Sequence, residues 1–180
     1  MNEIILSFKP EFFKALLTGK KHFEYRSRVP EKETVAYLYL SSPAKMIVGK
    51  MILGQRNNIQ DFLENSDLAN SSRPYLEKHL QEGAKYFSPI YSLSLLDSPI
   101  SLKQAKELSP KFNAPQGYSY VTNYKELHNF LEKSVFSTFE INPSNDLDFL
   151  GLFTKDIVKN YEQEIATPLY LEQYIKFWFA

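Results

Sequence analysis

Three charged residues within six positions, Lys21, Glu24 and Arg26, have the types and the spacing of a binding or catalytic site. Residues 22–28 alternate in the manner of a β-strand, so Glu24 and Arg26 share one face and are close enough for an ion pair. Lys21 follows Gly19, a typical helix stop, and we expect its ammonium to reach a cleft between helix and sheet. An amine in that position binds a phosphate or carbonyl oxygen, or acts as a catalytic amine if burial lowers its pKa.

The role of Glu24 has two interpretations. In a functional site it orients Arg26 toward a phosphate or base edge, or accepts a hydrogen bond from a cytosine-like amino group. A carboxylate is also a general base, so Glu24 joins Lys21 as a candidate catalytic group. In the structural interpretation, Glu24 and Arg26 form a salt bridge under the cleft, and loss of one partner leaves an uncompensated charge.

Polar residues near the end of an expected strand add candidates for ligand binding. The hydroxyls of Ser41 and Ser42, with the free backbone N–H groups beside them, are suited to a phosphate or a base edge. A simple strand-ending turn explains the same residues equally well. Lys9 and Arg28 add positive charge to the region. We therefore expect both of them to contact nucleic acid, together with Lys21 and Arg26.

A second polar segment lies before the last expected strand. Gln116 is a further ligand-binding candidate, and Tyr118 and Tyr120 share one strand face by alternation. Two such rings offer a stacking surface for a base. Aromatic residues in strands are more often part of the core, which is the alternative for this pair.

Metal and thiol chemistry is not expected. The chain has no cysteine, which excludes disulfides, thiol nucleophiles and thiolate zinc sites. The histidines His22, His79 and His128 are scattered without the spacing of metal ligands, so the sequence predicts neither a metal site nor a cofactor.

Charge is distributed unevenly along a chain of zero net charge. Residues 1–60 hold ten Lys or Arg against five Asp or Glu, and residues 61–180 hold eleven against sixteen. A basic first third attracts phosphates or carboxylates even in a neutral molecule. The hydrophobic fraction of 43% is enough for a core and excludes a disordered chain.

The N-terminus reaches charged residues after one short apolar run, which is unlike a secretory signal. No apolar run approaches the length that crosses a bilayer. We therefore expect a cytoplasmic protein without a membrane partner.

Short elements with a helix after the first strand predict an α+β fold: a small, partly open β-barrel with inserted helices. Strands are expected over residues 3–8, 22–28, 35–40, 46–53, 86–96 with a break at Pro89, and 118–121. Helices are expected from Pro10 to Gly19 and over residues 59–65, 74–81 and 101–108, the last capped by Ser101. Gly49 marks a bulge or a close approach of two strands.

From residue 123 the pattern becomes helical. We expect a first helix that begins with a capping box at Asn123 and Glu126, followed by a linker over residues 137–145. A second helix is expected over residues 147–161 and a third from Thr167. The apolar stripe of that third helix consists of Leu171, Tyr174, Ile175 and Trp178. The prediction is a barrel domain at residues 1–122 and a helical C-terminal extension at residues 123–180, packed on the barrel.

Four segments in order resemble the ASCH family, whose members share the PUA-like barrel. Gly19-x-Lys21-x-x-Glu24-x-Arg26 resembles the family motif, and residues 6–10 resemble its first strand entering its helix. Residues 39–43 together with residues 47–49 are similar to the SSP-type strand pair of a bacterial and archaeal subgroup. Residues 115–118 are similar to the PPQ-type closing motif of the same subgroup. The resemblance covers about residues 3–122.

The resemblance implies binding of RNA or a nucleotide-like ligand, in a cleft with Lys21, Glu24 and Arg26. It leaves an amidohydrolase of acetylated nucleosides such as N4-acetylcytidine as an alternative. In that branch of the family Lys21 matches the lysine, but Glu24 stands where a threonine is expected, and the distant glutamate has no assigned counterpart. Binding is therefore favoured over catalysis.

A third hypothesis is a regulatory protein in which the C-terminal helices bind a protein partner or mediate self-association. Residues 123–180 hold five Lys or Arg against nine Asp or Glu. That charge has the wrong sign for a helix that reads DNA.

Overall fold

The computed structural model describes residues 1–164, which form strands and short helices. The strands are β1 (Asn2–Phe8), β2 (Phe23–Arg26), β3 (Thr34–Leu40), β4 (Met46–Leu53), β5 (Asn57–Asn58), β6 (Tyr86–Ser101), β7 (Tyr118–Tyr120) and β8 (Phe136–Glu140). The α-helices are α1 (Pro10–Leu17), α2 (Ile59–Asn65), α3 (Arg73–Gln81), α4 (Leu102–Leu108), α5 (Lys125–Glu132) and α6 (Thr154–Tyr161). The 3₁₀ turns are η1 (Asp67–Ala69), η2 (Val121–Asn123) and η3 (Glu162–Glu164).

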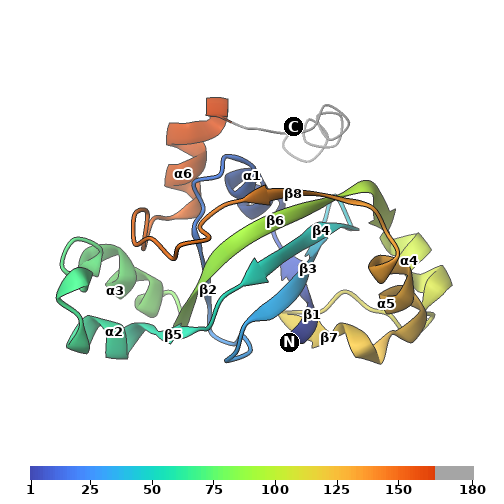
Figure 1. Cartoon of the computed structure of the whole chain (residues 1–180), viewed down its shortest axis with the longest axis horizontal. Helices are drawn as coiled ribbons and strands as arrows, with labels where there is room; N and C mark the ends of the chain where they lie inside the picture. Colours follow the sequence, from blue (N-terminus) through green and yellow to red (C-terminus); the bar gives the residue numbers. More distant parts are fainter. Residues whose placement is uncertain (165–180) are drawn as a thin grey trace.

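The strands form one mixed half-barrel sheet in the order β2-β6-β4-β3-β1-β7, with β5 and β8 also paired to β6 (Figure 1). β1 and β3 are parallel, and the other pairs are antiparallel. A parallel pair needs a crossover connection, which α1 and β2 supply. This α+β half-barrel confirms the expected fold class.

Both faces of the central strands are buried, because successive side chains of a strand point to opposite faces. On β1, Ile4 and Leu6 join a core that includes α1, whereas Ile5 joins a second core that includes α4 and α5. On β3, Leu38 likewise joins the first core and Tyr37 joins the second. A sheet covered on both faces accounts for the nearly continuous apolar runs of these strands.

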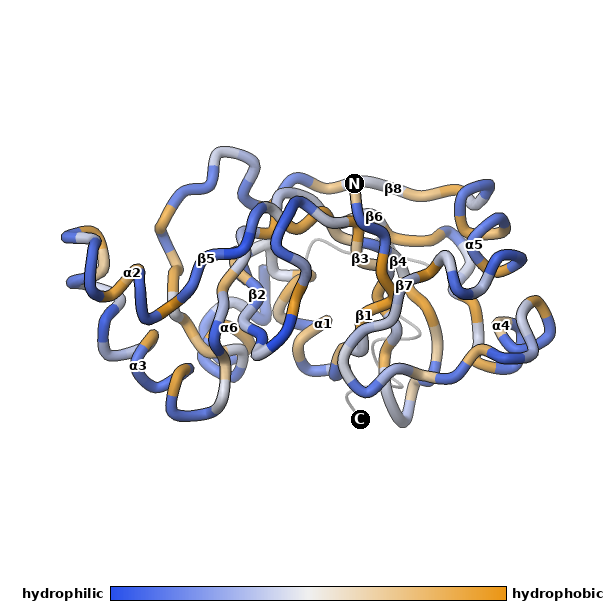
Figure 2. Tube along the Cα trace, turned by 90° about the horizontal axis from the view of Figure 1, so that it is seen from below, coloured by the Kyte–Doolittle hydropathy of each residue, from blue (hydrophilic) through white to orange (hydrophobic). Residues whose placement is uncertain are grey.

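A third core joins α2 and α3 to the β2 end of the sheet, through residues such as Phe23, Leu63 and Leu76. The two helix pairs therefore lie at opposite ends of the sheet, α2 and α3 at one end and α4 and α5 at the other (Figure 2). Hydrophobic segments in Figure 2 gather on the central strands between them. Among the described residues, no helix is long and apolar enough to cross a membrane.

Most of the expected elements before residue 122 are present with small shifts at their ends. Ser101 caps α4 in a capping box with Gln104, which confirms the expected cap. The break expected at Pro89 is wrong, because β6 continues through that residue opposite Phe23. Proline has no N–H to donate, but its carbonyl still accepts from the backbone N–H of Gly54 at 2.8 Å, just beyond the end of β4.

Three expectations after residue 122 are corrected. The predicted linker at residues 137–145 begins inside β8, which pairs with β6 and continues the sheet. The helix expected over residues 147–161 begins only at Thr154, because the preceding segment turns through Phe149 and Gly151 with positive φ. α5 starts after Tyr124 without a side-chain cap, so the capping box expected at Asn123 does not form.

The third predicted helix, with its stripe at Leu171, Tyr174, Ile175 and Trp178, lies outside the described residues. Within the extension, α5 packs on the sheet through Leu127 and Leu131. The domain division at residue 122 remains a prediction, and the sheet itself crosses it.

Gly49 lies at a close approach of β4 and β6. A Cβ atom added there would be 2.2 Å from the backbone oxygen of Ser94, and the β4–β6 register shifts beside it. Both features expected of Gly49 are thus present.

Substituting Gly49→Ala should destabilise the protein by about 1–3 kcal/mol, because a backbone oxygen cannot move aside as a flexible side chain does. The free energy of unfolding from urea denaturation measures the loss. Gly117→Ala is the matched control, since an added Cβ there meets nothing within 4 Å. Equal stability of the two variants would contradict the close approach.

Candidate functional site

The sharp turn after α1 directs Lys21 into the protein interior. Gly19 has a φ of +73°, and its backbone N–H donates to the carbonyl of Leu16 at 2.9 Å. This left-handed position after a helix is typical of glycine. The chain then enters β2, where Glu24 pairs with Ser88 of β6.

Lys21, Glu24 and Arg26 form one connected network. The Arg26 Nε donates to Glu24 Oε1 at 2.7 Å, and the Lys21 Nζ lies 3.4 Å from Glu24 Oε2. Two backbone carbonyls complete the network, since Lys21 donates to Phe23 at 2.9 Å and Arg26 donates to Ser7 at 2.7 Å. The ion pair expected between Glu24 and Arg26 is therefore present.

Burial differs among the three side chains, which are 5%, 2% and 19% exposed for Lys21, Glu24 and Arg26 respectively. Burial lowers the pKa of the Lys21 amine, and attraction to Glu24 opposes that shift. Glu24 compensates the charge of both cations, so loss of the Glu24 charge would leave uncompensated charge at a cost of about 3–5 kcal/mol. Glu24 thus holds both cations in place.

The network forms the floor of a cavity of about 650 Å³. The cavity is lined by five basic and three acidic side chains, together with aromatic and small residues. They are Lys9, Glu11, Phe12, Lys21, Glu24, Tyr25, Arg26, Ser27, Lys78, His79, Glu82, Gly83, Ala84, Phe153, Thr154 and Lys155. A volume of this size accommodates a small organic ligand.

One wall of the cavity is a stack of three rings. His79 lies between Tyr25, at a centroid distance of 3.8 Å, and Phe153, at 4.3 Å, with nearly parallel planes. The Lys78 ammonium lies 4.4 Å from the Phe153 ring centroid. On the other side of Tyr25, the Lys21 ammonium lies 5.4 Å from its centroid. The wall therefore joins aromatic faces to cations at both ends.

His79 is neutral at pH 7. Burial lowers its pKa to about 4, and its Nε2 forms a hydrogen bond with the carbonyl of Gly151 at 3.1 Å. The backbone N–H of Gly151 donates to the hydroxyl of Tyr25. The turn at Gly151 thus fixes both rings, and through them the position of Phe153.

The sequence-predicted site residues divide into two groups. Lys9 lines the cavity together with the buried network. Five others are not among the described residues that line it: Arg28, Ser41, Ser42, Gln116 and Tyr118.

Ser7 links part of that second group to the site. Its carbonyl accepts from Arg26, and its backbone N–H donates to the carbonyl of Gly117 at 2.9 Å. The segment with Gln116 and Tyr118 is thus next to the network without lining the cavity. Tyr118 packs against the first core and contacts the edge of Tyr120, so the core alternative describes Tyr118 better.

Sequence reasoning missed the half of the cavity that comes from α3 and from the start of α6. Lys78, His79, Phe153, Thr154 and Lys155 follow no motif that points to a shared site. One signal was present in the sequence, because Tyr25 lies between Glu24 and Arg26.

No family model matches the chain. A curated relative is the ASCH domain-containing ribonuclease of Zymomonas mobilis subsp. mobilis, which is 28% identical over 135 residues. The match covers 66% of this chain and 84% of the relative.

Crystal structures of the ASCH protein from Zymomonas mobilis have a similar fold. One matches with a TM-score of 0.52 and 24% identity, and covers 74% of this chain and 96% of the solved one. A tyrosine-to-phenylalanine variant of the same protein matches with a TM-score of 0.52 and 22% identity, over 75% of this chain and 100% of the solved one.

Acid should weaken the fold through His79. In the unfolded chain the ring takes up a proton near its ordinary pKa of 6.5, whereas in the folded protein it resists protonation until about pH 4. The unfolded state therefore binds more protons between these values, and stability falls by at most about 3 kcal/mol as pH drops through that window.

His79→Phe keeps a ring in the stack and removes the titration. Urea denaturation of both proteins at pH 7 and pH 4.5 measures the difference, and the variant should lose less stability on acidification. The same loss in both proteins would show that His79 does not carry the acid sensitivity.

Proposed function

We propose that the chain carries an ASCH domain that binds single-stranded RNA in the cavity above Lys21, Glu24 and Arg26. The observation that carries this proposal is a cavity that combines an excess of cations with an aromatic wall. The relative from Zymomonas mobilis is named a ribonuclease, which supports RNA as the ligand.

The cations of the cavity suit a phosphate backbone. Lys9, Lys78 and Lys155 are exposed at its rim, and Arg26 is partly exposed at its floor. Guanidinium and ammonium groups at different depths contact successive phosphates of a strand that bends into the cavity. Few such contacts are present, so binding should be of modest affinity and moderately salt-dependent.

Glu24 supports binding indirectly. Its side chain is 2% exposed, and both of its oxygens face the two cations. A direct hydrogen bond from a cytosine-like amino group to Glu24 therefore has little support. Its carboxylate instead keeps the Arg26 fork oriented toward the cavity, as a rigid support for a phosphate contact.

The rings of the cavity favour an unpaired base. Phe12, Tyr25 and Phe153 line it alongside neutral His79. Bases of single-stranded RNA are free to leave their neighbours and contact aromatic side chains, whereas bases of a duplex remain stacked inside it. The concave shape and the rings together support single-stranded over double-stranded RNA.

Removing two rim cations should weaken RNA binding without unfolding the protein. Lys78→Ala with Lys155→Ala changes exposed side chains and leaves the buried network intact. The binding constant falls as salt rises, and each lost phosphate contact makes the slope of log K against log salt less steep by about 0.7 for a single strand. Titration of a labelled single-stranded RNA at several salt concentrations measures affinity and slope.

The control variant is Lys103→Ala with Lys106→Ala, two exposed lysines of α4 at the other end of the sheet. It removes the same charge and should bind as the wild type does. Equal weakening by both double variants would show that general charge, and not the cavity, governs binding.

RNA cleavage is a second candidate function, favoured by the buried Lys21. Burial lowers the pKa of the Lys21 amine, which favours release of its proton. The free amine would accept the proton of the ribose 2′-hydroxyl, whose oxygen attacks the neighbouring phosphate. The bond from that phosphate to the 5′-oxygen of the next nucleotide breaks, and this oxygen leaves with a proton from water. Arg26, held by Glu24, is then the cation that faces the phosphate charge.

Lys21→Met tests the second candidate, because it keeps a long apolar side chain and removes the amine. If Lys21 transfers the proton, cleavage of a single-stranded RNA should fall by about 10²–10⁴-fold while binding through the rim lysines persists. A DNA strand of the same sequence, which lacks the 2′-hydroxyl, should bind and remain intact. Absence of wild-type cleavage under conditions of full binding would limit the function to binding.

The other hypotheses from the sequence have less support. An amidohydrolase of acetylated nucleosides is less favoured, because Glu24 pairs with two cations and stands where a threonine is expected. A regulatory role for the C-terminal helices depends mainly on residues beyond 164, outside the described part of the chain.

A further inference from the structure

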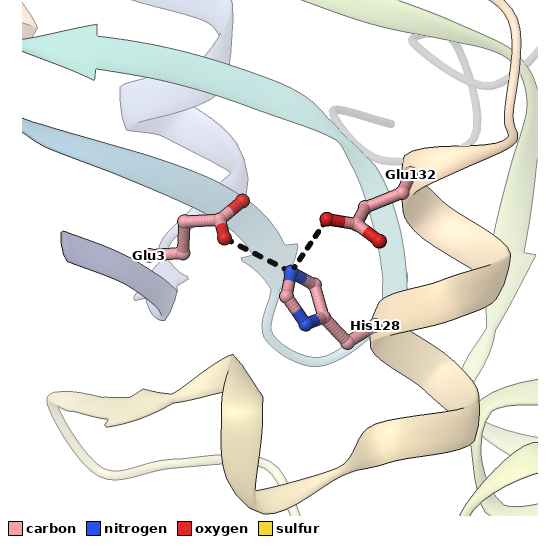
Figure 3. A group of neighbouring side chains, drawn as sticks. All are labelled: Glu3, His128 and Glu132. Atoms are coloured by element: carbon pink, nitrogen blue, oxygen red, sulfur yellow. Dashed lines mark hydrogen bonds and ion pairs between the residues drawn. The ribbon is translucent and has the colours of Figure 1, made fainter. Parts of the chain in front are cut away.

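Glu3, His128 and Glu132 point toward one another (Figure 3), and none of them lines the cavity. The His128 Nε2 lies 3.0 Å from Glu3 Oε2 and 3.5 Å from Glu132 Oε1. One ligand atom from each residue lies within 4.8 Å of the other two. Glu3 comes from β1 and the other two from α5, so the fold joins residues that are 125 positions apart.

The donor atoms of these side chains have the types and the spacing of metal ligands. His128 and Glu132 are four positions apart in α5, so they project from the same helix face. Metal bonds of about 2.1 Å in a tetrahedral site place ligand atoms about 3.4 Å apart. The observed separations of 3.0 and 3.5 Å fit that spacing without rearrangement of the backbone.

A buried residue next to the cluster supports the same interpretation. Tyr37 is 1% exposed, and its hydroxyl donates to Glu3 Oε1 at 3.5 Å, the oxygen that does not face His128. Hydrogen bonds of this kind orient carboxylate ligands in metal sites. Within the described part of the chain, His128 is the ion-pair partner of both Glu3 and Glu132, so two carboxylates share one imidazole.

We propose that Glu3, His128 and Glu132 bind a divalent transition-metal ion such as Zn²⁺. One imidazole nitrogen and two carboxylates favour zinc or a neighbouring transition metal over Mg²⁺ and Ca²⁺, which prefer oxygen ligands alone. Glu132 is 54% exposed, which leaves one side of the ion open to water as a further ligand.

The ion would join α5 to the first strand of the sheet. α5 already packs on the sheet through Leu127 and Leu131, and the ion adds a polar connection at its solvent-facing edge. α5 and α3 lie at opposite ends of the sheet, and α3 contributes to the cavity wall (Figure 1). The metal site is therefore distinct from the proposed RNA site, and its role is to hold the helix in place.

Calorimetric titration of the tag-free full chain with Zn²⁺ tests the site. We expect binding of one ion, together with a rise in melting temperature, because a ligand that binds only the folded state stabilises it. His128→Gln and Glu132→Gln should each reduce affinity by at least about tenfold and remove the rise in melting temperature. Glu126→Gln, in an exposed position of the same helix, is the matched control and should bind as the wild type does.

Nitrogen NMR of the imidazole rings identifies the ligand directly. Zn²⁺ should shift the Nε2 signal of His128 and leave His22 and His79 unchanged. Absence of stoichiometric binding, full affinity in Glu132→Gln, or an unshifted His128 signal would each overturn the proposal. The alternative, a protonated His128 that simply bridges two carboxylates, predicts these negative results.

Discussion

One buried carboxylate, Glu24, organises the candidate site, because it balances two cations that the interior would otherwise exclude. Lys21 keeps its amine in a buried position through Glu24 and the Phe23 carbonyl, and Arg26 keeps its orientation through Glu24 and the Ser7 carbonyl. Charges in a low-dielectric site interact more strongly than charges in water. The arrangement is thus a fixed electrostatic environment at the cavity floor, built before any ligand arrives.

The rim and the floor of the cavity have different roles in the proposed recognition of RNA. Exposed lysines such as Lys78 and Lys155 attract a polyanion over a long range, in a manner that salt weakens. The partly buried Arg26 and the rings around His79 act only after close contact, where shape and orientation matter. A neutral chain can in this way present a local cationic site without an overall positive charge.

Patterns in the sequence predicted those features of the fold and the site that depend on neighbouring residues. Short apolar runs identified β1 and β3, alternation placed Glu24 and Arg26 on one face, and the lack of a side chain identified Gly49 as a close approach. The missing half of the cavity depends on the positive-φ turn at Gly151, which brings Phe153 to His79 across more than seventy residues. Such contacts between distant segments leave no period or motif in a single sequence.

The 16-residue strand β6 has a consequence for synthesis of the protein. It pairs with β2 and β4, which precede it in the chain, and with β8, which follows it. On a growing chain β2 therefore has no partner until about sixty further residues have been made, and Glu24 stays in water until then. Desolvation of the charged network therefore follows the pairing of β2 with β6, after synthesis of the chain has passed residue 86.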